Sequence, residues 1–119
     1  MPDPAVIDPQ TIANLRSLNP GDGDEFFREI AGIFCEDTPL RLAELDQSLA
    51  SGDLAKFTRA AHSIKGSSAN LGAMALRAVA EKLEHQSRTS GLADTASLVD
   101  QIKAEFSRAR AALNDLVAK

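Results

Sequence analysis

Hydrophobic residues recur every three or four positions along most of the chain, which is the spacing that gathers them on one face of an α-helix. Five segments share this spacing and are bounded by residues that start or stop helices. The predicted helices span about 8–18, 22–51, 53–71, 73–89 and 94–117. The residues expected to face the core are, in chain order, Ile12 and Leu15; Phe27, Ile30, Phe34, Leu42, Leu45 and Leu49; Phe57, Ala61, Ile64, Ser68 and Leu71; Leu76, Val79, Ala80 and Leu83; and Leu98, Ile102, Phe106, Ala109, Leu113 and Leu116.

Aspartates and glycines set the predicted helix boundaries. The predicted N-caps are Asp8, Asp22, Asp53 and Asp94. Pro9 follows the first cap at the position where a helix tolerates proline, and Glu25 has capping-box spacing to the second cap. The glycines expected to end helices in the left-handed conformation are Gly52, Gly72 and Gly91.

Pro39 falls inside the second and longest predicted helix. Its ring removes one backbone hydrogen bond and crowds the preceding turn, which favours a kink or a break. The apolar stripe keeps its phase on both sides of the proline, so we predict one kinked helix. A break with Thr38 as a second N-cap is the alternative.

The composition agrees with an all-α fold. The chain holds 20 Ala and 14 Leu against 4 Val and 6 Ile, and it lacks Tyr and Trp, so strand-forming residues are scarce. Four amphipathic helices with short connections predict an antiparallel four-helix bundle with a short additional N-terminal helix. A length of 119 residues suits one such domain.

Charge and cysteine content exclude several classes of function. The net charge of −4 argues against nucleic-acid binding, which needs a basic excess. A single cysteine, Cys35, cannot form an intrachain disulfide, and we expect it to be a half-buried apolar side chain. The N-terminus does not resemble a signal peptide, and no apolar run is long enough to span a membrane. We therefore expect a cytoplasmic monomer that is not a membrane protein.

The segment HSIKGSSANLG, residues 62–72, contains a residue that its helix should not favour. Gly66 costs about 1 kcal/mol relative to alanine inside a helix, so another role must compensate. His62 lies about 140° from the buried stripe and faces outward. Its neighbours on this face are Lys65, Gly66 and Ala69. The pattern predicts an exposed imidazole with a cation beside it and a space cleared of side chains.

A phosphoryl group suits this arrangement. Neutral imidazole is a nucleophile, and Lys65 can both disfavour imidazolium and offset the charge of an arriving phosphoryl group. The imidazole also needs an acceptor that fixes its tautomer. A turn at Gly72 brings Glu81, Lys82 and Glu84 level with His62, and Glu84 lies at the edge of its helix, from which it can reach across. His85 faces away and is predicted to have no role.

The stretch AAHSIKGSSANLGAMAL resembles the histidine-containing phosphotransfer (HPt) domain, and the resemblance extends from about Asp22 to Leu116. It implies that His62 is the phosphoacceptor and that Lys65 and Gly66 assist the transfer. It also places Glu84 where the family often has Gln or Glu bonded to the imidazole. A kinase's nucleotide-binding domain and glycine-rich loop are lacking, so the resemblance implies a carrier of phosphate without kinase activity.

The expected partners are receiver domains of response regulators and of a hybrid histidine kinase, which would also supply Mg²⁺, since the chain is expected to hold no cofactor of its own. The residues expected to contact a partner are Arg59, Lys65, Gly66, Ala69, Ile12 and Leu15. The alternative function is a helical interaction module that binds a receiver or kinase domain without phosphotransfer.

Overall fold

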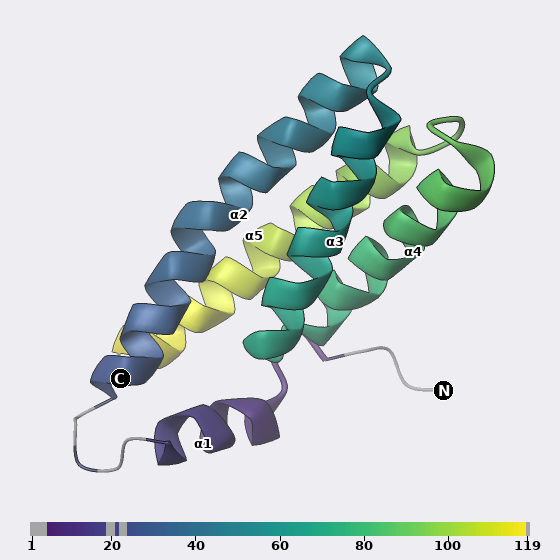
Figure 1. Cartoon of the computed structure of the whole chain (residues 1–119). Helices are drawn as coiled ribbons and strands as arrows, with labels where there is room; N and C mark the ends of the chain where they lie inside the picture. Colours follow the sequence, from purple (N-terminus) through teal and green to yellow (C-terminus); the bar gives the residue numbers. More distant parts are fainter. Residues whose placement is uncertain (1–4, 19–20, 22–23, 119) are drawn as a thin grey trace.

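The computed structural model describes residues 5–18, 21 and 24–118, and these form five helices and no strand. The helices are α1 (Pro9–Ser17), α2 (Glu25–Ser51), α3 (Leu54–Asn70), α4 (Met74–Ser90) and α5 (Ala96–Ala118). Helices α2 to α5 run alternately up and down, and α1 lies across one end of them (Figure 1). Each of the four long helices packs against its neighbours in chain order, and α5 returns to α2. The predicted four-helix bundle with an additional N-terminal helix is confirmed.

Two of the four predicted N-caps are confirmed. The side chains of Asp8 and Asp53 accept hydrogen bonds from the backbone N–H groups of Gln10 (3.2 Å) and Lys56 (3.1 Å). These bonds satisfy donors that the first turn of a helix leaves free.

The predicted starts of the second and last long helices are wrong. Helix α2 begins at Glu25, directly after Asp24 in a left-handed conformation with φ 67°, while Asp22 lies outside the described residues. Before α5, Asp94 is also left-handed, with φ 59°. The N-cap is the next residue, Thr95, whose carbonyl accepts the first helical bond from Val99 (3.0 Å).

Helix α2 continues through Pro39 without a break, as the phase of its apolar stripe predicts. Phe34 and Leu45 are buried on either side of the proline, and Pro39 itself faces solvent. Burying one such side chain contributes about 1.5–3 kcal/mol, and an interior proline costs about 3 kcal/mol. The two burials together contribute about 3–6 kcal/mol, which matches or exceeds the cost of the proline. Thr38 is a buried residue inside the helix rather than a second N-cap.

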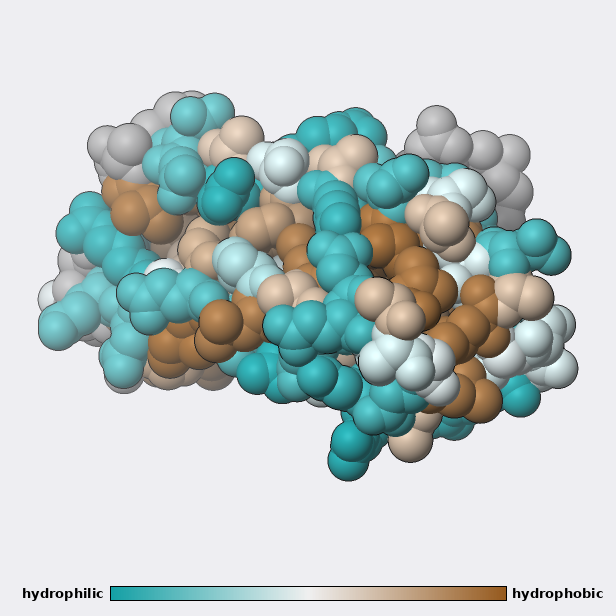
Figure 2. Space-filling view, turned by 90° about the horizontal axis from the view of Figure 1, so that it is seen from above, coloured by the Kyte–Doolittle hydropathy of each residue, from teal (hydrophilic) through white to brown (hydrophobic). Residues whose placement is uncertain are grey.

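The core contains most of the residues that the stripes predict. Phe34 and Phe106 meet across the bundle with ring centroids 5.6 Å apart. Some predicted core residues are only partly buried at its margin: Leu15, Ile30, Leu42, Leu49, Val79, Leu98 and Leu116. Hydrophobic residues also reach the surface in patches between hydrophilic side chains (Figure 2). None of the described helices is long and apolar enough to cross a membrane.

The turn between α3 and α4 is fixed by the segment that precedes α1. The backbone N–H of Asp8 donates to the carbonyl of Gly72 (2.7 Å), and that of Ala75 donates to Ala5 (2.9 Å). Gly72 has a φ of 72°, and a Cβ atom there would lie 2.7 Å from the Cβ of Thr11. Only glycine combines this conformation with this contact, so the turn that aligns α3 with α4 depends on it.

Candidate functional site

His62 lies near the middle of α3 with its side chain turned toward α4. The side chain is 62% exposed, and its Nδ1 lies 2.8 Å from Oε2 of Glu84. The predicted pairing across the hairpin is thus confirmed by the geometry. His85, one residue further along α4, is exposed, as its helical position predicts.

A second contact between α3 and α4 sets the register that brings this pair together. The hydroxyls of Thr58 and Ser87 are hydrogen-bonded at 2.8 Å. Thr58 lies one turn before His62, and Ser87 lies one turn after Glu84, as expected for antiparallel neighbours. Ser87 is fully buried, so this bond forms inside the helix interface.

Glu84 is a buried carboxylate bonded to three side chains. Its side chain is only 6% exposed. Oε1 lies 2.7 Å from Lys65 Nζ, and Oε2 lies 2.8 Å from His62 Nδ1 and also 2.8 Å from Arg88 Nη2, with which it forms an ion pair. A buried charge is tolerated when it is paired and hydrogen-bonded in this way. Glu84 therefore holds the side chains of His62, Lys65 and Arg88 together from a buried position.

Arg88 is a site residue that the sequence analysis missed. It follows Glu84 by four residues on α4, which is the spacing of a favourable acid–base pair along one helix face. This spacing was the available signal, but it is common on exposed helices. Only the burial of Glu84 makes the pair notable.

The environment of Glu84 has opposing effects on its pKa. Burial raises the pKa of the Glu84 carboxyl, whereas the hydrogen bonds and charges of Lys65 and His62 lower it. The lowering effects together exceed the effect of burial, so the pKa of the Glu84 carboxyl lies below its usual range. Glu84 is therefore ionised at neutral pH and acts as an acceptor.

An ionised Glu84 fixes the tautomer of His62. A carboxylate can only accept, so the ring proton lies on Nδ1 and is donated to Glu84. The other nitrogen, Nε2, then carries a lone pair, and the side chain is largely exposed. The arrangement orients the imidazole so that its neutral form can act as a nucleophile toward an incoming molecule.

Lys65 is placed differently from the expectation that its charge faces an arriving group. Its side chain is 27% exposed, and Nζ is paired with Glu84. In this structure, the lysine charge is thus largely offset by the carboxylate.

Gly66 has no side chain and Ala69 has a small one, so few side-chain atoms rise from the helix face beside His62. Gly66 is exposed within the regular helix, and a Cβ atom built there meets nothing within 4 Å. The structure therefore gives no packing reason for glycine at this position. Ala69 is half-buried one turn further on.

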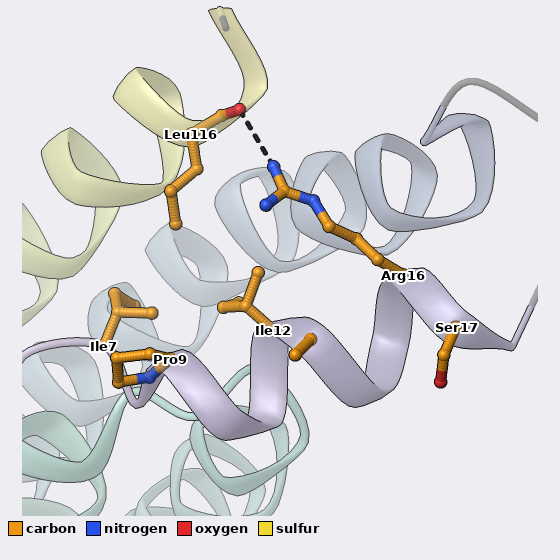
Figure 3. Close-up of a pocket in the computed structure, with 7 residues that line it drawn as sticks. Ile7, Pro9, Ile12, Arg16, Ser17 and Leu116 are labelled. Atoms are coloured by element: carbon orange, nitrogen blue, oxygen red, sulfur yellow. Dashed lines mark hydrogen bonds between the residues drawn. The ribbon is translucent and has the colours of Figure 1, made fainter. Parts of the chain in front are cut away.

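The predicted partner residues do not form one surface. Arg59 is exposed one turn before His62 in α3. Ile12 is only 4% exposed and points from α1 toward Leu116 of α5, at the end of the bundle (Figure 3). Leu15 is partly buried against the same core. The predicted contact of Ile12 with a partner does not agree with this burial, because Ile12 lies on the inner face of α1 at the end of the bundle, as its place in the apolar stripe predicts.

The remaining candidates for chemistry are the thiol of Cys35 and a metal site. Cys35 is half-buried as predicted, and burial raises the pKa of its thiol. Within the described part of the chain, no three His, Cys, Asp or Glu side chains are grouped so as to hold a metal ion. Both oxygens of Glu84 are already bonded to nitrogen donors.

The lowered pKa of Glu84 predicts an acid-sensitive contribution to stability. The contribution is complete above the carboxyl's unfolded pKa of about 4.3 and is lost as the pH falls through the lower folded value. Glu84→Gln should therefore be less stable than the unmodified chain at pH 7. The gap between their free energies of unfolding, measured in urea from pH 7 to pH 3, should shrink below about pH 4.3.

Glu81→Gln is the matched control, because Glu81 lies on the same helix with its side chain 57% exposed and only a long contact of 3.8 Å to Arg77. That variant should match the unmodified chain across the range. A gap for Glu84→Gln that stays constant or widens in acid would show that the carboxylate is not stabilised in the folded state.

Comparisons with known proteins agree with this geometry. Residues 29–112 match the model of the Hpt domain family. The chain is 31% identical over 83 residues to "Multistep phosphorelay regulator 1" of Schizosaccharomyces pombe, a match that covers 70% of the chain and 28% of that protein. The chain thus spans little more than a quarter of this relative.

Two crystal structures have the same fold. That of histidine-containing phosphotransfer protein B from Pseudomonas aeruginosa superposes with a TM-score of 0.84 at 29% identity, covering 92% of both chains. That of a histidine-containing phosphotransfer protein from Medicago truncatula superposes with a TM-score of 0.83 at 22% identity, covering 95% of this chain and 78% of that one. With its family match over most of the chain and an oriented, exposed histidine in the third helix, this protein belongs to the Hpt domain family.

Proposed function

We propose that this chain is an intermediate of a multistep phosphorelay in which His62 accepts a phosphoryl group from the phosphoaspartate of one receiver domain and passes it to the aspartate of another. The observation that carries the proposal is the bond from His62 Nδ1 to the buried Glu84 carboxylate, which leaves Nε2 free on an exposed side chain. Family membership and the relative named as a multistep phosphorelay regulator support this role.

The transfer balances without an external acid or base. The lone pair of Nε2 attacks phosphorus, the new N–P bond forms, and the P–O bond to the donor aspartate breaks. The aspartate leaves as a carboxylate, and the imidazole ring gains positive charge while its proton stays on Nδ1. Glu84 accepts that proton's hydrogen bond throughout, so its negative charge stabilises the charged ring. The reverse sequence delivers the phosphoryl group to the second receiver.

Lys65 and Arg88 have distinct roles in this proposal. Both hold Glu84 in place, and neither is needed as a nucleophile or base. Lys65 can turn outward from its partly exposed position toward a phosphoryl group on Nε2, while Arg88 continues to neutralise Glu84. The two cations exceed the single charge of Glu84 by one, so one positive charge is available to an arriving phosphoryl group.

Mg²⁺ is supplied by the receiver. Among the described residues, the carboxylate that contacts His62 is that of Glu84, and its oxygens are engaged by Lys65, His62 and Arg88. A divalent ion prefers several free oxygen ligands, which the phosphoaspartate site of a receiver would provide. The chain acts as a carrier, and the donor and acceptor domains contribute the remaining chemistry.

Replacing His62 tests the proposal directly. The chain is mixed with receiver domains of its source organism that have been phosphorylated with acetyl phosphate and Mg²⁺, and acid-labile, alkali-stable phosphate on the chain is measured. The unmodified chain should be labelled, and His62→Gln should not be. His85→Gln should be labelled normally, because His85 is exposed and takes no part in the contacts that Glu84 makes with His62, Lys65 and Arg88.

Two outcomes would overturn parts of this account. Labelling that survives in His62→Gln would place the phosphate elsewhere. Binding of a receiver without any labelling of the unmodified chain would favour an interaction module. Phosphoramidate, a small donor, should label His62 in EDTA as well as in Mg²⁺, whereas EDTA should stop transfer from a receiver.

Gly66→Ala should raise the stability of the fold and slow the transfer of phosphate. The added methyl meets open space in a regular helix, so the free energy of unfolding should rise by about 0.5–1 kcal/mol. The same methyl lies one turn from His62 and should hold a docked receiver away, and a shift of about 1 Å at the reacting atoms can slow transfer about a hundredfold. Thermal melting and the rate of phosphate transfer from a receiver measure the two effects.

Gly32→Ala calibrates the stability change, because Gly32 is also exposed inside a helix with nothing within 4 Å of a built Cβ. The two variants should gain similar stability. A destabilised Gly66→Ala, or one that transfers phosphate at the normal rate, would refute a docking role for this glycine.

A further inference from the structure

A polar cavity of about 370 Å³ lies between α2 and α3, on the side of His62 that faces away from Glu84. Arg59 and Ser63 line it from α3, and they lie three residues before and one residue after His62. The remaining lining residues are Arg41, Glu44, Lys56 and Ala60. The cavity is therefore next to the phosphoacceptor, and three of its six lining residues are cationic.

Two of these cations have no carboxylate partner in the described part of the chain. Arg41 pairs with Glu44 at 2.7 Å and lies 3.6 Å from Asp37, so its charge is offset. Lys56 Nζ donates at 3.0 Å to the side-chain amide of Gln47, which is uncharged. Arg59 is exposed and has neither a hydrogen bond nor an ion pair among the described residues.

The two sides of His62 therefore differ in electrostatic character. On the α4 side, Lys65 and Arg88 both pair with Glu84, whose single negative charge offsets one of their two positive charges. On the α2 side, Lys56 and Arg59 leave a local positive field on a chain whose net charge is −4. Unpaired cations on an otherwise acidic protein attract an acidic surface and orient it as it approaches.

We infer that Lys56 and Arg59, with Arg41 behind them, form a docking patch for acidic side chains of the protein that exchanges phosphate with His62. This inference rests on the proposed function and specifies the chemistry of the partner: a protein surface with carboxylates beside its phosphoaspartate. Arg59 presents a planar, unpaired guanidinium that can bind a carboxylate through two hydrogen bonds. The patch steers the encounter, and it sets the orientation in which His62 meets the phosphoaspartate.

The inference is tested with the double variant Lys56→Glu, Arg59→Glu. Glutamate at position 56 suits the first turn of α3 after the Asp53 cap, so the fold should be retained. The probe is the phosphorylated receiver domain that labels the unmodified chain fastest. At low ionic strength, the second-order rate of transfer should fall about tenfold or more in the double variant. At about 0.5 M salt, where charges are screened within a few ångströms, the two rates should converge.

A matched control changes the same charge elsewhere. Lys82 and Arg108 line a separate cavity between α4 and α5, so Lys82→Glu, Arg108→Glu alters the net charge equally without touching the patch. This control should transfer at the normal rate at every salt concentration. Labelling by phosphoramidate verifies that His62 stays reactive in each variant.

The outcomes separate the inference from the proposed function. If the unmodified chain accepts phosphate and the patch variant matches it, or if the control variant slows equally, the docking patch is refuted while the phosphorelay role stands. If no phosphorylated receiver labels the unmodified chain, the proposed function fails, and the docking inference fails with it.

Discussion

The chemistry of this protein depends on one buried negative charge. Glu84 is almost fully removed from solvent, which would be costly for an isolated carboxylate, and three nitrogen donors make that burial tolerable. One of the donors is His62, so the same bond that satisfies Glu84 also fixes the imidazole tautomer and leaves Nε2 available. Stability and reactivity are thus linked, because removing the carboxylate would release the histidine and leave Lys65 and Arg88 without their common partner.

The fold places Glu84 beside His62 by fixing the register between α3 and α4. Gly72 permits a tight turn against Thr11, and the hydrogen bond between Thr58 and Ser87 fixes how far α4 runs back along α3. A shift of one residue on α4 would rotate Glu84 by about 100° and remove it from the imidazole. The rest of the bundle supplies the core that holds these helices together. His62 lies on its surface between cations that pair with Glu84 on the α4 side and, on the α2 side, cations that have no carboxylate partner among the described residues.

Much of this arrangement could be predicted from the sequence. The apolar stripes predict the bundle, the phase of α2 across Pro39 predicts a continuous helix, and counting from Gly72 predicts the pairing of His62 with Glu84. Other features depend on tertiary contacts that cannot be predicted from the pattern of residues along the chain. The burial of Glu84, and therefore the role of Arg88, follows from packing between helices. Ile12 covers the end of the bundle because α1 folds across it. Asp94 lies in the left-handed turn before α5, and the helix begins one residue later than the sequence pattern predicts.

The position of phosphorus on the imidazole ring of His62 shows whether Glu84 fixes the tautomer of that ring. The chain is labelled with ¹⁵N and phosphorylated, and the ¹⁵N–³¹P coupling together with the ring ¹H–¹⁵N correlations identifies the substituted nitrogen. If Glu84 holds the proton on Nδ1, phosphorus is coupled to Nε2, and Nδ1 stays protonated in the free and phosphorylated forms. Phosphorus on Nδ1, or a free protein whose ring proton resides mainly on Nε2, would contradict the account.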